Sequence, residues 1–335
     1  MDNSAAGLYI AAKIDMYRLV TLPTNTPRCP SVCRLATPLL IFLAALAWGC
    51  HSTRPVERAQ GSPPAAWIEW QKARQESIAG TNGWTTLISR YWLPEGRTAA
   101  GTDPTNQLVL PAGRAAASVG DFSRNGKSVH FKATPGVEAT VGGVPVRELE
   151  MKSDAAGDPT KLIIGPLSFV IIERGERLGV RVRDPESPTR LGFAGLRFFP
   201  YAAEWRIEGR FEAFPSVRTM RVPDASGGMQ ELSSPGALVF EHGGKEYRLD
   251  AVEEPGEDEF FIIFTDRTAG DSTSAAGRFL YVARPDAAGR VMIDFNRAFT
   301  PPCGFTPFAT CPRPPDQNRL PFAIVAGERK PVEAQ

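Results

Sequence analysis

The sequence predicts a mainly β protein: a β-sandwich followed by a second β domain, with one amphipathic helix in front. Short apolar segments of alternating polarity recur between residues 83 and 330, and the 31 glycines and 30 prolines are spread among them. Runs of about four to eight such residues, bounded by turn formers, are typical of strands. At 335 residues the chain is long enough for two domains.

The helix is predicted over residues 65–82, which begin "AAWIEWQKARQESIAG". Steps of about three and four residues connect Trp67, Trp70, Ala73 or Arg74, and Ile78, the spacing that places side chains on one helix face. Gly80 stands where a helix is expected to stop.

The body of the chain is divided at "DPESPTR", residues 184–190, where two prolines interrupt the strand pattern. Residues 83–185 are predicted to form the β-sandwich, and residues 186–330 the second β domain with a loop rich in cysteine and proline. A single continuous β structure carrying the same loop is the alternative.

Residues 1–49 are predicted to be a secretory signal. Arg28 and Arg34 precede an apolar run at residues 39–48, about half of the ~20 residues that a membrane-spanning helix needs. The leader is long for a signal, so we expect Met16 to be the true start.

Cys50 directly follows the small residue at the end of this run, which resembles a bacterial lipobox. The resemblance implies lipidation of Cys50, anchoring to the membrane on the periplasmic side, and a polar tether over residues 50–64. Ala47 and Trp48 depart from the Leu and the Ala or Ser that the lipobox usually has there. An ordinary signal peptide or an uncleaved anchor remains open.

The composition gives no reason to expect nucleic acid as a partner. The formal net charge is +1, with 38 basic and 37 acidic residues and no block of one sign.

Cys303 and Cys311 are the cysteines that lie beyond the leader and the tether. An even pair in an exported protein predicts a disulfide. A zinc site would need about four ligands, and the histidines are His51, in the tether, His130 and His242. No metal site is therefore predicted, and the sequence leaves open whether the protein has a cofactor.

Two short strings are similar to hydrolase motifs, "GDS" at 270–272 and "HGG" at 242–244. Neither is accompanied by a G-x-S-x-G nucleophile elbow, and no histidine follows His242. Both strings are interpreted as turns.

Residues 93–148 resemble a forkhead-associated β-sandwich. "LPEGRTAAGTDPTNQLVLP" and "VEATVGGVPV" are similar to the start and finish of that fold. The resemblance implies the fold and not phosphothreonine recognition, because Thr102 stands where the family has arginine, and Gly142 and Gly143 replace Asn-Gly.

"FIIFTDRTAGDSTSAAGRFLY" and "DFNRAFTPPCGFTPFATCPRPPDQNRLPFAIVAGE" resemble the signature of the domain-of-unknown-function family DUF1684. The resemblance extends through "RLGVRVRD" and "FAGLRFFPYAAEWRIEGRFE", so it covers most of residues 65–330. Ser274 stands where the family often has tyrosine. The family has no established activity, so the resemblance implies a fold and not a reaction.

Polar side chains at strand ends predict a site for a small anionic or polar ligand, with the Cys303–Cys311 loop as a rigid wall. Arginine forks suit carboxylates and phosphates, and β scaffolds usually bind ligands in their loops. The candidate ligand-binding residues are Arg181, Arg183, Asp266, Thr268, Arg278, Asp294, Asn296, Asn318 and Arg319.

Three alternatives remain open from the sequence. The protein is an enzyme of hydrolase type with Asp266 or Asp294 as general base, or an envelope scaffold that binds other proteins. The same polar residues also have a purely structural interpretation, since Asn and Asp often satisfy loop backbone and arginines often form surface networks.

Overall fold

The computed structural model describes residues 63–331. The predicted signal at 1–49, its start at Met16 and the lipidation site Cys50 lie outside these residues, as does nearly all of the tether. Among the residues that are described, no helix is long and apolar enough to cross a membrane.

The first unit consists of two β-sheets packed face to face. The larger sheet has the order β1–β11–β10–β9–β6–β7. Its strands are β1 (Leu87–Trp92), β11 (Arg177–Arg183), β10 (Leu167–Arg174), β9 (Leu162–Ile164), β6 (Ala139–Val141) and β7 (Val144–Val146). The second sheet has the order β3–β2–β4–β5–β8. Its strands are β3 (Leu108–Val109), β2 (Gly96–Gly101), β4 (Gly120–Asn125), β5 (Ser128–Ala133) and β8 (Glu148–Glu150).

Apolar side chains from both sheets form one core between them. Phe122 packs against Phe131 with ring centroids 5.0 Å apart and against Phe169 of the facing sheet at 6.1 Å. All three phenylalanines are fully buried. The strands of this sandwich lie within the predicted range of 83–185.

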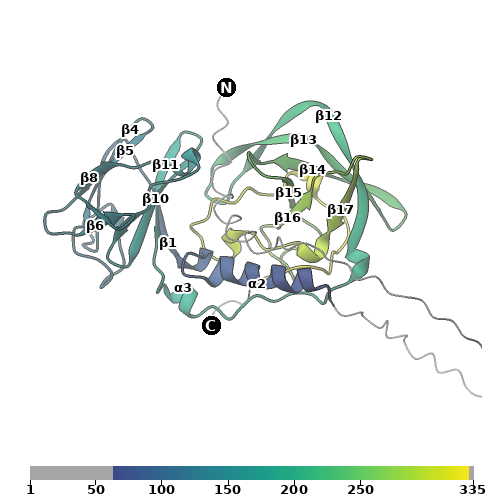
Figure 1. Ribbon diagram of the computed structural model, residues 1–335, viewed down its shortest axis with the longest axis horizontal. Coiled ribbons are helices and arrows are strands. Elements are labelled where there is room, and N and C mark those ends of the chain that lie inside the picture. Colours follow the sequence, from purple (N-terminus) through teal and green to yellow (C-terminus); the bar gives the residue numbers. More distant parts are fainter. Residues whose placement is uncertain (1–62, 332–335) are drawn as a thin grey trace, which may run out of the picture.

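The second unit is a curled antiparallel sheet of order β16–β15–β14–β13–β12–β17, seen at the right of Figure 1. Its strands are β12 (Arg206–Pro223), β13 (Met229–His242), β14 (Lys245–Glu253), β15 (Glu259–Phe264), β16 (Arg278–Ala283) and β17 (Arg290–Asp294). Successive residues of β15 enter different cores: Phe260, Ile262 and Phe264 enter one, and Phe261 and Ile263 the other. Both faces of this strand are therefore covered.

Helix α2 (Ala65–Ala79) covers one face of this second sheet, as Figure 1 shows. Trp67, Trp70 and Ile78 share a core with Phe261 and Phe279. The indole N–H of Trp67 donates to the carbonyl of Asn296 at 2.9 Å. The predicted helix is confirmed, but it packs on the unit that lies farther along the chain.

Short helical turns connect the longer elements. They are α3 (Pro188–Leu191), η1 (Trp84–Thr86), η2 (Asp154–Ala156), η3 (Ala203–Trp205), η4 (Phe295–Arg297), η5 (Pro302–Gly304) and η6 (Asp316–Asn318).

The cysteine- and proline-rich loop lies between the two units. The hydroxyl of Thr306 donates to the carbonyl of Leu87 at 3.2 Å, and Arg90 donates to the carbonyl of Ala309 at 2.9 Å. Leu87 and Arg90 both belong to β1 of the first unit. The loop thus ties the second unit to the larger sheet of the sandwich.

Candidate functional site

Asp266 and Arg278 form a buried ion pair, with Nη2 and Oδ2 2.5 Å apart and each side chain 1% exposed. Arg278 also donates to the carbonyls of Ala326 and Ile324. Burial lowers the pKa of Arg278, an effect that Asp266 opposes. This pair holds the segment around Ile324 and Ala326 against β16.

Thr268 completes the shell around Asp266. Its N–H and hydroxyl donate to Asp266 Oδ1 at 2.9 and 2.7 Å, and the N–H of Ile324 donates to the same oxygen at 3.1 Å. Thr268 Oγ1 also shares a hydrogen bond with Thr273 Oγ1. The predicted grouping of Asp266, Thr268 and Arg278 therefore exists, and most of its polar atoms bond one another; Arg278 Nε has no partner among the described residues.

Asp294 and Asn296 also meet. Asp294 Oδ1 accepts from the backbone and side-chain nitrogens of Asn296 at 3.1 and 3.0 Å. The Asn296 amide in turn pairs with the N–H and carbonyl of Ala202. Asn296 is fully buried, and these bonds make its amide a link between its own segment and the backbone at Ala202.

Asn318 and Arg319 lie apart from that pair. Fully buried, Asn318 accepts from the N–H of Asp250 at 2.7 Å and donates to the carbonyls of Asp250 and Ile263, both at 2.9 Å. It connects β14 to β15. Arg319 is exposed and pairs with Asp316 three residues earlier.

Arg181 and Arg183 belong to a different surface, which we call the arginine face. Arg181 of β11 lies opposite Arg90 of the neighbouring strand β1, and Arg177 of β11 lies opposite Arg174 of β10. Because residues paired across antiparallel strands share a side and alternate residues point the same way, Arg90, Arg174, Arg177, Arg181 and Arg183 project together. The intervening Leu178, Val180 and Val182 point into the sandwich core.

The arginine face meets the second unit and carries more positive than negative charge. Asp154 accepts from Arg174 at 3.1 Å and Asp224 from Arg177 at 3.2 Å. Arg183 donates instead to the carbonyl of Gly83 at 2.6 Å. Both aspartates are buried.

Arg181 is 4% exposed, and two of its guanidinium nitrogens, Nε and Nη2, have no hydrogen-bond partner among the described residues. The guanidinium lies 5.4 Å from the ring centre of Trp84. Burial, followed by the charges of Arg174 and Arg183, lowers the pKa of Arg181 well below its usual range. Burial also lowers the pKa of Arg183, to about 10.

Cys303 and Cys311 are thiols in the structure, so the predicted disulfide is not formed there. They are nevertheless neighbours, since the N–H of Cys303 donates to Cys311 Sγ at 3.2 Å. A hydrogen bond from Cys311 lowers the pKa of Cys303, and burial opposes this. The loop keeps its shape through hydrogen bonds, and a bond between the sulfurs would require an electron acceptor.

A cavity of about 790 Å³ lies where the two units meet. One wall is the turn between β10 and β11, at residues 174–176. The others come from β12, β13, the end of β14 with the loop after it, Phe261 of β15 and Arg284 just after β16. Pro312 of the cysteine- and proline-rich loop also lines it. Cavities of this size accommodate small-molecule ligands.

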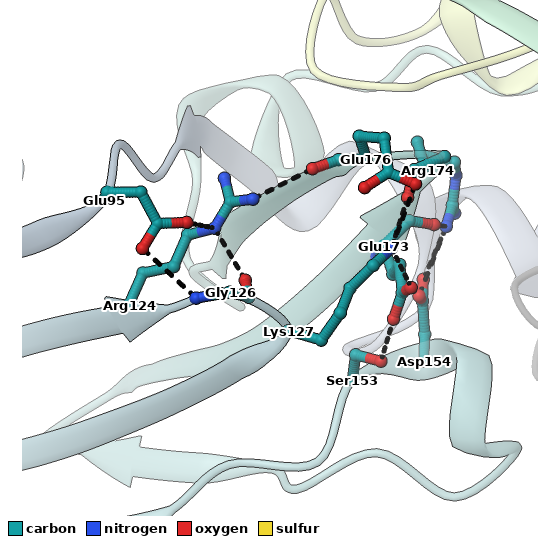
Figure 2. Close-up of polar contacts among 10 residues, drawn as sticks. Glu95, Arg124, Gly126, Lys127, Ser153, Asp154, Glu173, Arg174 and Glu176 are labelled. Atoms are coloured by element: carbon teal, nitrogen blue, oxygen red, sulfur yellow. Dashed lines mark hydrogen bonds and ion pairs between the residues drawn. The ribbon is translucent and has the colours of Figure 1, made fainter.

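The turn that forms the first wall is held by ion pairs within the sandwich, as Figure 2 shows. Lys127 reaches Glu173 at 2.8 Å, and Arg174 lies against Asp154. Arg124 donates to the carbonyl of Glu176 at 3.0 Å. The turn is therefore a stable wall of the cavity.

Glutamates outnumber arginines by five to three in the cavity lining. The five are Glu176, Glu231, Glu253, Glu254 and Glu257; the three are Arg174, Arg221 and Arg284. Each arginine bonds a carboxylate: Arg174 bonds Asp154, Arg221 bonds Glu231 at 3.3 Å, and Arg284 bonds Glu253 at 2.8 Å.

Glu254 is the most buried of these glutamates, at 7% exposed, and accepts the Tyr281 hydroxyl at 3.2 Å. Burial, then the negative charges of Glu254, Glu257 and Glu259, raises the pKa of Tyr281 well above its usual range. Glu254 and Glu257 therefore place two carboxylates close together on this side of the cavity.

None of the nine candidate ligand-binding residues lines this cavity. The cavity residues stand in strands and turns that carry no motif, and most are glutamates and arginines in ordinary alternating sequence. The run "VEEPGEDE", residues 252–259, is the one local signal: it concentrates carboxylates at a proline–glycine turn.

The fold and the site together define a protein of two β units joined around a charged cavity. Residues 191–329 match the sequence model of the family described as "Protein of unknown function (DUF1684)", which confirms the predicted family for this segment. The match covers the second unit and not the sandwich or helix α2.

Two solved structures are similar to parts of the chain. One is the solution structure of an uncharacterized protein of Haloarcula marismortui, with 26% identity, 44% of this chain and 82% of that chain covered, and a TM-score of 0.37. The other is the FHA domain of FhaA, solved with the intracellular domain of Rv3910, with 16% identity, 28% and 97% covered, and a TM-score of 0.21. No curated protein matches the chain.

Proposed function

We propose that the protein binds a small polar ligand carrying a cationic group in the cavity between its two β units. The observation that carries this proposal is the acidic lining of an approximately 790 Å³ cavity whose arginines already bond carboxylates. Cavities at the junction of two units are frequent ligand sites.

The charge balance favours a cation over the anionic ligand expected from the sequence. Arg221 and Arg284 bond Glu231 and Glu253 in the lining itself, so an incoming anion would have to displace these carboxylates. An ammonium group would instead meet the carboxylate of Glu254 in a partly dehydrated setting, where charge-assisted hydrogen bonds are strong.

A thermal-shift screen of the full chain tests the proposal. The probes are primary amines, each matched with the alcohol and the carboxylic acid of the same skeleton. A ligand at a hundred times its dissociation constant stabilises by about 2.7 kcal/mol. We expect amines to raise the melting temperature and the matched alcohols and acids to leave it unchanged.

Glu254→Gln keeps the shape of the side chain and removes its charge, so it should abolish the amine shift. Glu148→Gln is the matched control, because Glu148 is an exposed glutamate of the sandwich outside the cavity. Stabilisation by acids alone would reverse the proposed charge preference. If no compound in the screen shifts the melting temperature, the interpretation of the protein as an envelope scaffold that binds other proteins is favoured.

The enzyme alternative has less support from the geometry. Asp266 already bonds Arg278, Thr268 and the N–H of Ile324, and Asp294 bonds Asn296. Neither carboxylate lines the cavity, where a substrate would have access to it.

The cellular setting is a separate proposal. The apolar run before Cys50 supports export and lipid anchoring in the bacterial envelope, with the β units on the periplasmic side. Cys50→Ala should release the protein from membranes; unchanged association would point to an uncleaved anchor. In that oxidising compartment Cys303 and Cys311 would form the predicted disulfide.

A further inference from the structure

Cys303 and Cys311 lie where the loop of the second unit touches the arginine face. Arg174 donates to the hydroxyl of Thr310 at 3.1 Å, and Arg90 to the carbonyl of Ala309. Cys311 is close enough to Arg181 for a negative charge on its sulfur to raise the pKa of Arg181, that is, to favour the charged guanidinium. The attraction is mutual, so Arg181 favours the Cys311 thiolate.

Arginines lie close to both thiols. Arg174 donates to Thr310, the residue next to Cys311, and the charge of Arg181 interacts with Cys311, Arg174, Arg183 and Asp154. Arg313 acts on Cys303 from the loop itself. The two guanidinium nitrogens of Arg181 that have no partner among the described residues are donors that a buried thiolate would use.

The two sulfurs differ in access. Cys311 is 3% exposed, whereas Cys303 is half-buried and reachable from solvent. The hydrogen bond from Cys311 stabilises the Cys303 thiolate, the form that attacks a disulfide. A partly exposed thiolate next to a second thiol is the arrangement that thiol–disulfide exchange requires.

We propose that Cys303 and Cys311 form a reactive dithiol that exchanges with an external disulfide, with Cys303 as the attacking sulfur and Cys311 as the resolving one. The inference does not depend on the ligand cavity. It goes beyond a static structural disulfide, because it assigns different roles to the two sulfurs and a role to Arg181.

The exchange is balanced when a disulfide is the oxidant. The Cys303 thiolate attacks one sulfur of that disulfide, whose S–S bond breaks, and the departing thiolate takes up a proton. The Cys311 thiolate then attacks the Cys303 sulfur and expels the second external thiolate, which is also protonated. Two thiols of the protein are oxidised to one disulfide, and the external disulfide is reduced to two thiols.

Arg181 acts in the second step as a positioning residue. Its buried charge favours the Cys311 thiolate, and the N–H of Cys303 already holds that sulfur 3.2 Å away. Removing that charge should slow ring closure and leave the first attack nearly unchanged. If Arg181 only filled space, its replacement would not slow one step more than the other.

The test uses the reduced full chain and glutathione disulfide, with site-resolved mass spectrometry because the chain has five cysteines. The wild type should form the Cys303–Cys311 disulfide with little trapped intermediate. Cys311→Ala should accumulate a mixed disulfide at Cys303, and Cys303→Ala should leave Cys311 unmodified while folded.

Two further readouts examine the charges. The rate of Cys303 alkylation should reach half its maximum below the usual thiol pKa of about 8.5, and Cys311→Ala should move that midpoint upward. Arg181→Gln should slow ring closure about tenfold, the effect of one pKa unit on the thiolate fraction. Arg181→Lys should partly restore the rate, and exposed Arg97→Gln is the control.

Equal modification of both sulfurs, or faster reaction at Cys311, would overturn the assigned roles. A folded wild type that resists glutathione disulfide would overturn the reactivity itself, and this measurement needs no variant. If an alanine variant unfolds, as judged by near-ultraviolet circular dichroism, the corresponding serine variant replaces it.

Discussion

Arg74 of helix α2 donates to Glu328, 254 positions later, with Nε 2.9 Å from Oε2. The Arg74 side chain is 6% exposed and that of Glu328 is fully buried. Arg74 also donates to the carbonyl of Thr300 at 2.6 Å and lies 4.6 Å from the ring centre of Phe299. The first and last described segments of the chain are thereby joined through one ion pair.

Arg74→Met should lower the free energy of unfolding by about 3–5 kcal/mol, because it leaves the Glu328 carboxylate buried without its cation. Glu328→Met should have a similar cost. The double variant should cost less than the sum of the two, since no buried charge remains. Urea denaturation measures all three, and additive costs would contradict the coupling.

Stability should depend on pH with opposite signs at Glu328 and Asp224. Burial raises the pKa of Glu328, although Arg74 opposes this. A carboxyl with a raised folded pKa contributes stability below its unfolded pKa and loses it as pH rises through the folded value. The stability of wild type relative to Glu328→Gln should therefore increase toward acid.

Asp224 should behave in the opposite way. Burial raises its pKa, but hydrogen bonds from Ser226 and Gly228 and the charge of Arg177 together leave it lowered. Its contribution is present above the unfolded pKa and is lost as pH falls through the folded value. The advantage of wild type over Asp224→Asn should be constant above about pH 5 and shrink as the pH falls below that, in denaturant titrations. A constant gap would contradict this assignment.

Asn318→Ala should cost at least about 2 kcal/mol, because it leaves one N–H and two carbonyls without the partner they now have. The substitution should not change ligand binding, because Asn318 does not line the cavity. Melting curves with and without a bound amine separate the two effects. Loss of binding in a folded variant would place Asn318 in the site after all.

Gly277→Ala should be more harmful than Gly289→Ala. Both glycines have left-handed backbone, with φ of 90° and 78°. A Cβ at Gly277 would lie 2.8 Å from the carbonyl of Phe264 and 2.3 Å from Pro314 Cγ, whereas nothing lies within 4 Å at Gly289. Gly289→Ala should cost only the backbone strain of about 1–2 kcal/mol. Equal melting temperatures for the two variants would contradict the steric argument.

Much of the fold was predictable because it depends on local pattern. Short apolar runs such as "DEFFIIFTD" and the glycines at turns indicate strands and hairpins without knowledge of their partners. The amphipathic spacing of Trp67, Trp70 and Ile78 likewise identified helix α2. Its place on the second unit was not predictable, because the partner face is formed by residues far along the chain.

The candidate site was less predictable, because the role of a polar side chain depends on its neighbours in space. Asp266, Arg278 and Asn318 have the residue types of a binding site, yet their polar atoms are used within the fold. Glu254 carries no motif, and it becomes notable only because the two units enclose it beside Tyr281.

The sequence by itself determined the strands, the front helix and the family of the second unit, because hydrophobic periodicity and turn chemistry act over a few residues. Tertiary structure alone decided which charges are paired. Burial and distance between remote segments make Arg74 a partner of Glu328, leave two nitrogens of Arg181 without a partner among the described residues, and bring five glutamates to one cavity.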